Sequence, residues 1–183
     1  MIEEIRHNDI VLSIIIRANY DSEGIKFFTP DDFSQQLAYM KREKDYVIDP
    51  HVHNHVERNV SLTQEVLLIR SGKVRVDYYD DDRNYLESRI LNKGDVVLLA
   101  HGGHGFEMIE ESEIIEIKQG PYAGERDKER FEPAWEKVRY IEEGIKGLPG
   151  LKDARMSYYP KSGKGTGYHT IGLRVILDDL SID

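Results

Sequence analysis

The chain of 183 residues is long enough for one domain with a hydrophobic core, and a second full domain is not expected. The formal net charge of -9 and the sequence pI near 5.3 argue against nucleic acid and anionic membrane surfaces as main partners, because both bind basic faces. With no cysteine, a disulfide framework and a thiolate metal site are excluded, and any metal must be held by nitrogen and oxygen ligands.

The N-terminal stretch MIEEIRHND is acidic and lacks the basic and apolar regions of a signal peptide. The longest apolar stretch, residues 10–16, is far shorter than the roughly 20 residues that span a bilayer. We therefore expect a cytoplasmic protein. Residues 10–17 (IVLSIIIR) are rich in β-branched side chains and predict a buried strand. Residues 29–32 (TPDD) predict a single helical turn, and residues 33–49 an extended strand that reaches Pro50.

The segment from residue 65 to residue 118 has the clearest β pattern. Within residues 73–79, Val74, Val76 and Tyr78 alternate with charged residues. Further strands are predicted at residues 65–70, 85–91, 96–100, 106–109 and 114–118, with turns at 71–72, 80–84 and 92–95. Six or more short strands without an intervening helix predict an antiparallel sandwich or barrel.

The composition changes after Gly120. Residues 122–131 are highly charged and predict a solvated connector, and Pro133 stands at the start of a helix predicted over residues 133–145. A glycine-rich loop at 161–167 and a strand at 171–177 follow. We therefore expect a β domain over residues 1–121 and a C-terminal extension over residues 122–183 that supplies no site residue.

Three histidines stand at alternate positions before the strand that begins at Glu65. On a strand, residues two apart face the same way, so His51 and His53 would present both rings to one face. Glu65 opens the next strand, and His104 opens a later one. Two or three imidazoles with one carboxylate suit a mononuclear zinc, iron, manganese or nickel ion. A polar strand end beside a metal-free pocket is the alternative, and His55 is an alternative ligand to either neighbour.

These residues resemble the two half-motifs of the cupins, a superfamily of small jelly-roll barrels (double-stranded β-helices). The first half-motif, His-x-His, then Glu, six residues and Gly, corresponds here to His51-Val-His53, Glu65, VLLIRS and Gly72. In the second, Gly94, Gly102 and His104 match, Ala100 replaces a proline, and Met108 stands where asparagine is usual. His104 comes one residue early, and the gap between His53 and Glu65 is longer than in the family. Glu57 stands at the family-like distance, but no apolar run follows it, so Glu65 is preferred.

The resemblance spans roughly residues 33–120. It implies an all-β cupin barrel with one divalent metal held by His51, His53, Glu65 and His104, with His104 and Glu65 also as catalytic residues. The candidates for substrate binding are Gln35, Tyr39, His55, Arg58, Phe106 and Met108. Because cupin barrels expose sheet edges and the strand at 10–16 is too apolar to lie bare, we also expect a homodimer.

Several functions agree with this resemblance. The run GGHGFEM at residues 102–108 is similar to the W-H-x-F-E run of cupin keto-isomerases that act on nucleotide-linked sugars in surface-polysaccharide synthesis. We therefore expect a metal-dependent isomerase, epimerase or oxygenase with a small polar, sugar-derived substrate. The keto-isomerases use histidine without a metal, so a metal-free enzyme with His104 as its base is one alternative. A non-catalytic small-molecule sensor or binding module is the other.

Overall fold

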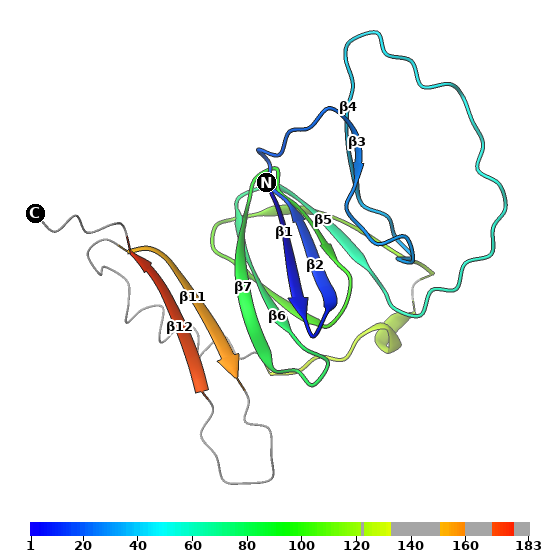
Figure 1. Cartoon of the computed structure of the whole chain (residues 1–183). Coiled ribbons are helices and arrows are strands. Elements are labelled where there is room, and N and C mark those ends of the chain that lie inside the picture. The colour runs from blue at the N-terminus through cyan, green and yellow to red at the C-terminus, as the bar shows by residue number, and fades with distance from the viewer. Residues whose placement is uncertain (122, 133–150, 160–169, 178–183) are drawn as a thin grey trace, which may run out of the picture. The chain divides into compact units, whose positions relative to one another are not determined.

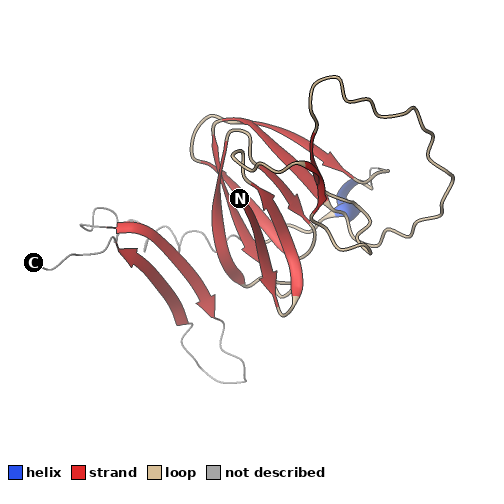
Figure 2. Cartoon of the chain, turned by 45° about the horizontal axis from the view of Figure 1, so that its top comes forward, coloured by secondary structure: helices blue, strands red, loops and turns tan. Residues whose placement is uncertain are grey.

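A computed structural model describes residues 1–121, 123–132, 151–159 and 170–177. These residues form β-strands joined by turns and loops, with one 3-10 turn, η1 (Gly124–Asp127) (Figures 1 and 2). The predicted all-β class is confirmed. The helix predicted at 133–145 and the loop predicted at 161–167 lie outside the described residues. In the part of the chain that is described, no helix has the length and apolarity needed to cross a membrane.

The described residues fall into two compact units. The first contains Met1–Ser71, Asn92–His101 and Ser112–Asp127. Its strands are β1 (Ile2–His7), β2 (Ile10–Ile16), β3 (Gly24–Phe27), β4 (Ala38–Lys41), β5 (Glu65–Ser71), β8 (Val96–Leu99) and β10 (Glu113–Lys118). Five of them form an antiparallel sheet in the order β1-β2-β8-β5-β10, and β3 pairs with β4.

Strand β2 lies inside the five-stranded sheet, as its β-branched sequence predicts. Every residue from Val11 to Ile16 is buried. Ser13 is in register with Leu99, so strands that lie far apart in the chain are direct neighbours. One face of the sheet carries an apolar cluster that consists of Val11, Ile14, Ile16, Leu37, Val66, Leu98 and Ala100.

Of the strand predicted over residues 33–49, only β4 (Ala38–Lys41) is present. Residues 41–45 are five consecutive charged residues, and the chain turns there, because the Tyr46 N–H donates to the Glu43 carbonyl at 3.3 Å and Asp45 has a φ of 68°. Residues 42–64, all of which are described, then contain no strand. Figure 1 shows them as a wide loop between β4 and β5. Residues 29–32 also form a hydrogen-bonded turn rather than a helical turn, with the Phe33 N–H donating to the Pro30 carbonyl.

The second unit contains Gly72–Leu91, Gly102–Glu111 and the described residues that follow Lys128. Its strands are β6 (Lys73–Tyr79), β7 (Tyr85–Asn92), β9 (Gly103–Met108), β11 (Leu151–Tyr159) and β12 (Thr170–Leu177). They form one sheet in the order β7-β6-β9 and an antiparallel pair, β11-β12. The strand predicted at 171–177 is therefore confirmed.

Both faces of β6 are buried, which its alternating pattern did not predict. Arg75 and Asp77 are 4% and 3% exposed, and their side chains form a two-bond ion pair with distances of 2.9 and 3.0 Å. Glu107 on β9 accepts from the same guanidinium at 2.8 Å, and Ser88 on β7 donates to Asp77 at 2.5 Å. The buried charges are thus paired within one sheet, as burial requires.

Candidate functional site

The three histidines of the predicted metal site lie in the exposed loop of residues 42–64, outside any strand. Strand alternation therefore does not position them. The rings of His51 and His53 are nevertheless neighbours, with centroids 5.4 Å apart and planes at 78°. Two imidazoles that share a metal at about 2.0–2.1 Å per nitrogen have their centroids at a similar separation. The pair is thus compatible with two ligands of one ion.

The His51 ring is held by a hydrogen bond to its own loop. Its Nδ1 lies 3.0 Å from the carbonyl oxygen of Asp49. Since a carbonyl oxygen only accepts, Nδ1 must donate, and in the neutral ring Nε2 then keeps its lone pair. Metal-binding histidines commonly have this arrangement, in which the second nitrogen fixes the tautomer and the ring direction. His51 therefore fits a metal ligand through Nε2.

Glu65 is the first residue of β5, as predicted. It is in register with Lys118 of β10, and its carboxylate lies 3.6 Å from the Lys118 ammonium. Burial lowers the pKa of Lys118, but the hydrogen bond to Asp127 and the charge of Glu65 raise it overall. Glu65 thus faces a lysine that stays positively charged, and a metal at this carboxylate would compete with that ammonium.

His104 lies on β9, directly opposite the buried Tyr78 of β6. Its ring is 5.4 Å from that of Phe106, the next residue on the same face. Phe106 and Met108 are 39% and 50% exposed, so the face that these three residues share remains partly open to solvent. The predicted common face of His104, Phe106 and Met108 therefore exists.

Gly103, the residue before His104, has a packing role. A Cβ atom on Gly103 would lie 3.1 Å from Cζ of Phe131 and 3.2 Å from Cβ of Tyr79. The rings of Phe131 and Tyr79 contact each other edge to face, with centroids 5.0 Å apart. The glycine-rich run that the cupin resemblance used is thus also explained by the room that these two rings need.

Of the four predicted ligands, the structure places His51 and His53 side by side. Across the described ranges, no group of three or more histidine, aspartate or glutamate side chains could hold a metal ion. His51 and His53 lie together, whereas Glu65 belongs to the first unit and His104 to the second. The two imidazoles therefore fit the first two ligands of a metal ion.

The other predicted binding residues lie in different settings. His55 and Arg58 are exposed in the 42–64 loop, as is the alternative ligand Glu57. On β4, the Tyr39 hydroxyl donates to Asp21 at 3.3 Å. Partial burial and the negative charge of Asp21 raise the pKa of Tyr39, so the phenol stays protonated and serves as a hydrogen-bond donor to this carboxylate.

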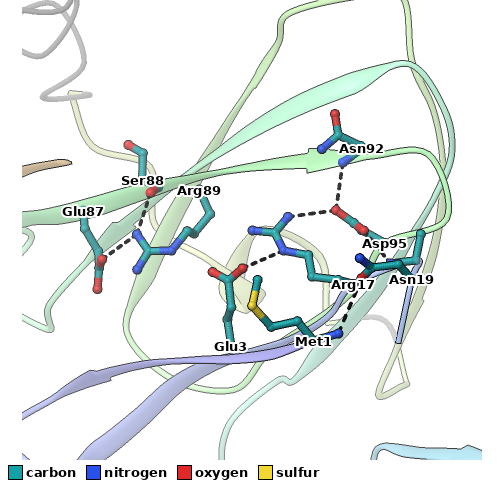
Figure 3. A network of polar contacts seen from close by, with 10 residues as sticks. Met1, Glu3, Arg17, Asn19, Glu87, Ser88, Arg89, Asn92 and Asp95 are labelled. Atoms are coloured by element: carbon teal, nitrogen blue, oxygen red, sulfur yellow. Dashed lines mark hydrogen bonds and ion pairs between the residues drawn. The ribbon is translucent and has the colours of Figure 1, made fainter. Parts of the chain in front are cut away.

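A buried polar network in the first unit was not foreseen from the sequence (Figure 3). Asp95, which is 3% exposed, accepts from Arg17 at 2.8 Å, from the Ala18 N–H at 2.8 Å and from the Asn92 N–H at 2.9 Å. Arg17 also donates to Glu3 at 2.7 Å. The turn predicted at residues 92–95 (Asn-Lys-Gly-Asp) was the only sequence signal for this network. Its contacts indicate a structural role for Asp95 and Arg17.

Comparison of the chain with models of protein families, with curated proteins and with solved structures finds no match. Function must therefore be inferred from the residues and contacts described above. Of these, the histidine pair with its oriented Nε2 is the feature closest to a chemical activity.

Proposed function

We propose that this protein is a cupin-type barrel that binds one divalent metal ion through His51, His53, Glu65 and His104. The observation that carries the proposal is the hydrogen bond from His51 Nδ1 to the Asp49 carbonyl, which leaves Nε2 free beside the ring of His53. The antiparallel all-β architecture and the position of Glu65 at the start of β5 support it.

The activity we propose is isomerisation, epimerisation or oxygenation of a small polar, sugar-derived molecule. A divalent ion held by these four residues would supply Lewis-acid polarisation of a carbonyl or hydroxyl oxygen of such a molecule. Glu65 and His104 are also the proposed acid–base residues, since a carboxylate or an imidazole that is not coordinated to the ion can accept a proton and return it. Phe106 and Met108 share the face of His104 and offer apolar contacts to the substrate.

Metal analysis of protein purified without added metal tests this proposal. We expect about one equivalent of a divalent ion, and a lower melting temperature after chelation, because a ligand that binds only the folded state adds about 2.7 kcal/mol at a hundredfold excess over its Kd. His51→Ala and His53→Ala should lose both effects. His7→Ala is the control, because His7 is part of β1 and its ring contacts Asn8. Wild-type protein without metal and without a chelator effect would refute the metal site.

A metal-free enzyme with His104 as base is the second candidate. It is favoured by the cross-strand pair of His104 and Tyr78, which places an imidazole and a phenol on one face of the β6–β9 ladder. Activity on nucleotide-linked keto-sugars that persists in a chelator, and is lost in His104→Asn but not in His53→Ala, would support this candidate over the first. Binding of such a sugar without turnover would instead indicate a sensor or binding module.

A further inference from the structure

A hollow of about 440 Å³ lies at one end of the five-stranded sheet. Three strand ends meet there: the start of β2 at Ile10, the residues that follow β8, and Gln64, which precedes β5. Ala100 and His101 lie beside β2, because their N–H groups both donate to the Leu12 carbonyl, at 2.8 and 3.2 Å. The volume falls within the range of small-molecule sites, about 300–1,000 Å³.

The hollow contains a hydrogen-bond donor with a fixed direction. Gln64 is 6% exposed, and its Oε1 accepts from the Gln35 N–H at 3.0 Å and from Ser34 Oγ at 3.3 Å. Ser34 Oγ in turn accepts from Gln119 Nε2 at 3.2 Å, so its own hydrogen is directed to Gln64. Because a backbone N–H needs an acceptor, these bonds fix which end of the Gln64 amide is oxygen.

The Nε2 of Gln64 is therefore the end of the amide that remains for a ligand. In the described part of the chain it makes no hydrogen bond, although Gln64 lines the hollow. The neighbouring Gln35 has a buried Oε1 that also has no hydrogen-bond partner in the same part of the chain. Gln35 is not one of the residues that line the hollow, so the ligand contact is assigned to Gln64 alone.

The lining favours an uncharged ligand. Its charged groups include the carboxylates of Asp9 and Asp32, which would repel an anion. Arg6 also lines the hollow, but its guanidinium already donates to Glu4 at 2.7 Å and to the Asp9 carbonyl at 3.2 Å. A cation is disfavoured, because it would lie next to this positively charged guanidinium and next to the N–H groups of Gln64. Carboxylate acceptors, an amide donor and an apolar wall that includes Phe33 together suit a molecule with several hydroxyl groups.

We infer that this hollow is a binding site for a small uncharged polyhydroxylated molecule of the monosaccharide class. It is distinct from the proposed metal site, because the residues that line it include none of the four proposed ligands, His51, His53, Glu65 and His104.

Saturation-transfer NMR with D-glucose, D-galactose and myo-inositol at about 10 mM tests the inference, because weak small-ligand sites are still occupied at this concentration. Glucosamine and glucose 6-phosphate are the charged probes. We expect at least one neutral probe to bind more tightly than its charged counterparts. Gln64→Leu should weaken that binding about two- to tenfold, the effect of one lost neutral hydrogen bond.

A matched pair of variants controls for folding. Leu62 lines the hollow and Val60 does not, although both lie in the same loop and are 51% and 44% exposed. Leu62→Trp should abolish binding by filling the space, whereas Val60→Trp should bind as wild type. Absence of binding by all three neutral probes, preference for a charged probe, or equal binding by the two tryptophan variants would overturn the inference. Repeating the saturation-transfer NMR in the presence of a chelator tests whether binding in the hollow depends on the proposed metal site.

Discussion

The substitution Gly103→Ala tests the packing of β9. The added Cβ would lie 3.1 Å from Cζ of Phe131 and 3.2 Å from Cβ of Tyr79, whereas carbon atoms prefer about 3.5–4.0 Å. Tyr79 is 2% exposed, and its Cβ is one bond from the backbone, so it cannot rotate away. The Phe131 ring must therefore move from its edge-to-face contact with Tyr79.

Overpacking of this kind lowers the free energy of unfolding by about 1–3 kcal/mol. For a chain of this size, each kcal/mol shifts the melting temperature by about 2–4 °C, so we expect a decrease of about 2–12 °C. Thermal melts followed by circular dichroism and urea denaturation measure both quantities. The matched control is Gly105→Ala on the same strand, where the nearest atom to a new Cβ is Cε2 of Tyr79 at an ordinary 3.9 Å.

We expect Gly105→Ala to leave stability within about 0.5 kcal/mol of wild type. A second substitution, Phe131→Leu, should remove part of the Gly103→Ala cost, because the two positions are in contact and their effects are then not additive. Equal melting temperatures for the two alanine variants would show that Phe131 and Tyr79 do not pack against Gly103 as described.

Three further predictions follow from other contacts. Trypsin should cut first within the exposed residues 42–64. If the histidines of this loop bind metal, saturating Zn²⁺ should slow the cleavage severalfold. An unchanged cleavage rate would argue against ordering of the loop by metal. Asp95→Ala should lower the free energy of unfolding by about 3–5 kcal/mol, since it leaves two N–H groups without their buried acceptor and removes one of the carboxylate partners of Arg17; a loss below about 1 kcal/mol in urea denaturation would contradict this. The hydrogen bond from Lys41 lowers the pKa of Asp21, so the stability that this bond contributes is present above the ordinary carboxyl pKa and is lost as the pH falls through the lowered pKa. In an NMR titration, Lys41→Gln should raise the pKa of Asp21. An unchanged pKa would exclude Lys41 as the cause of the shift.

The strands were predictable from sequence where one local signal decided them. β2 is a run of β-branched residues, and β5 and β6 flank Gly72, which has the positive φ of 79° that favours glycine in a tight turn. β1 was missed because Ile2 and Ile5 are its only isoleucines among charged residues, and its strand form depends on pairing with β2. Such pairing is a tertiary effect that propensity does not contain.

The candidate site was predictable only in part for the same reason. The alternating histidines predicted that His51 and His53 share one face of a strand. The charged residues 41–45 before them form a turn instead, and residues 42–64 form no strand pairing. The two rings still meet, through contacts within the loop itself. The burial of Arg75 was not predictable from alternation, because a period of two does not tell whether the polar face is covered.

The pairing of β2 with β8 has a consequence for synthesis on the ribosome. Ser13 and Leu99 are in register although roughly 85 residues separate them in the chain. At about 5–20 residues per second, β2 waits roughly 4 to 17 s for its partner to be made. During that interval only β1 can cover one edge of this apolar strand, and its other edge is open to wrong partners. Slow synthesis should therefore favour aggregation of the nascent chain, and a chaperone that binds β2 early should prevent it.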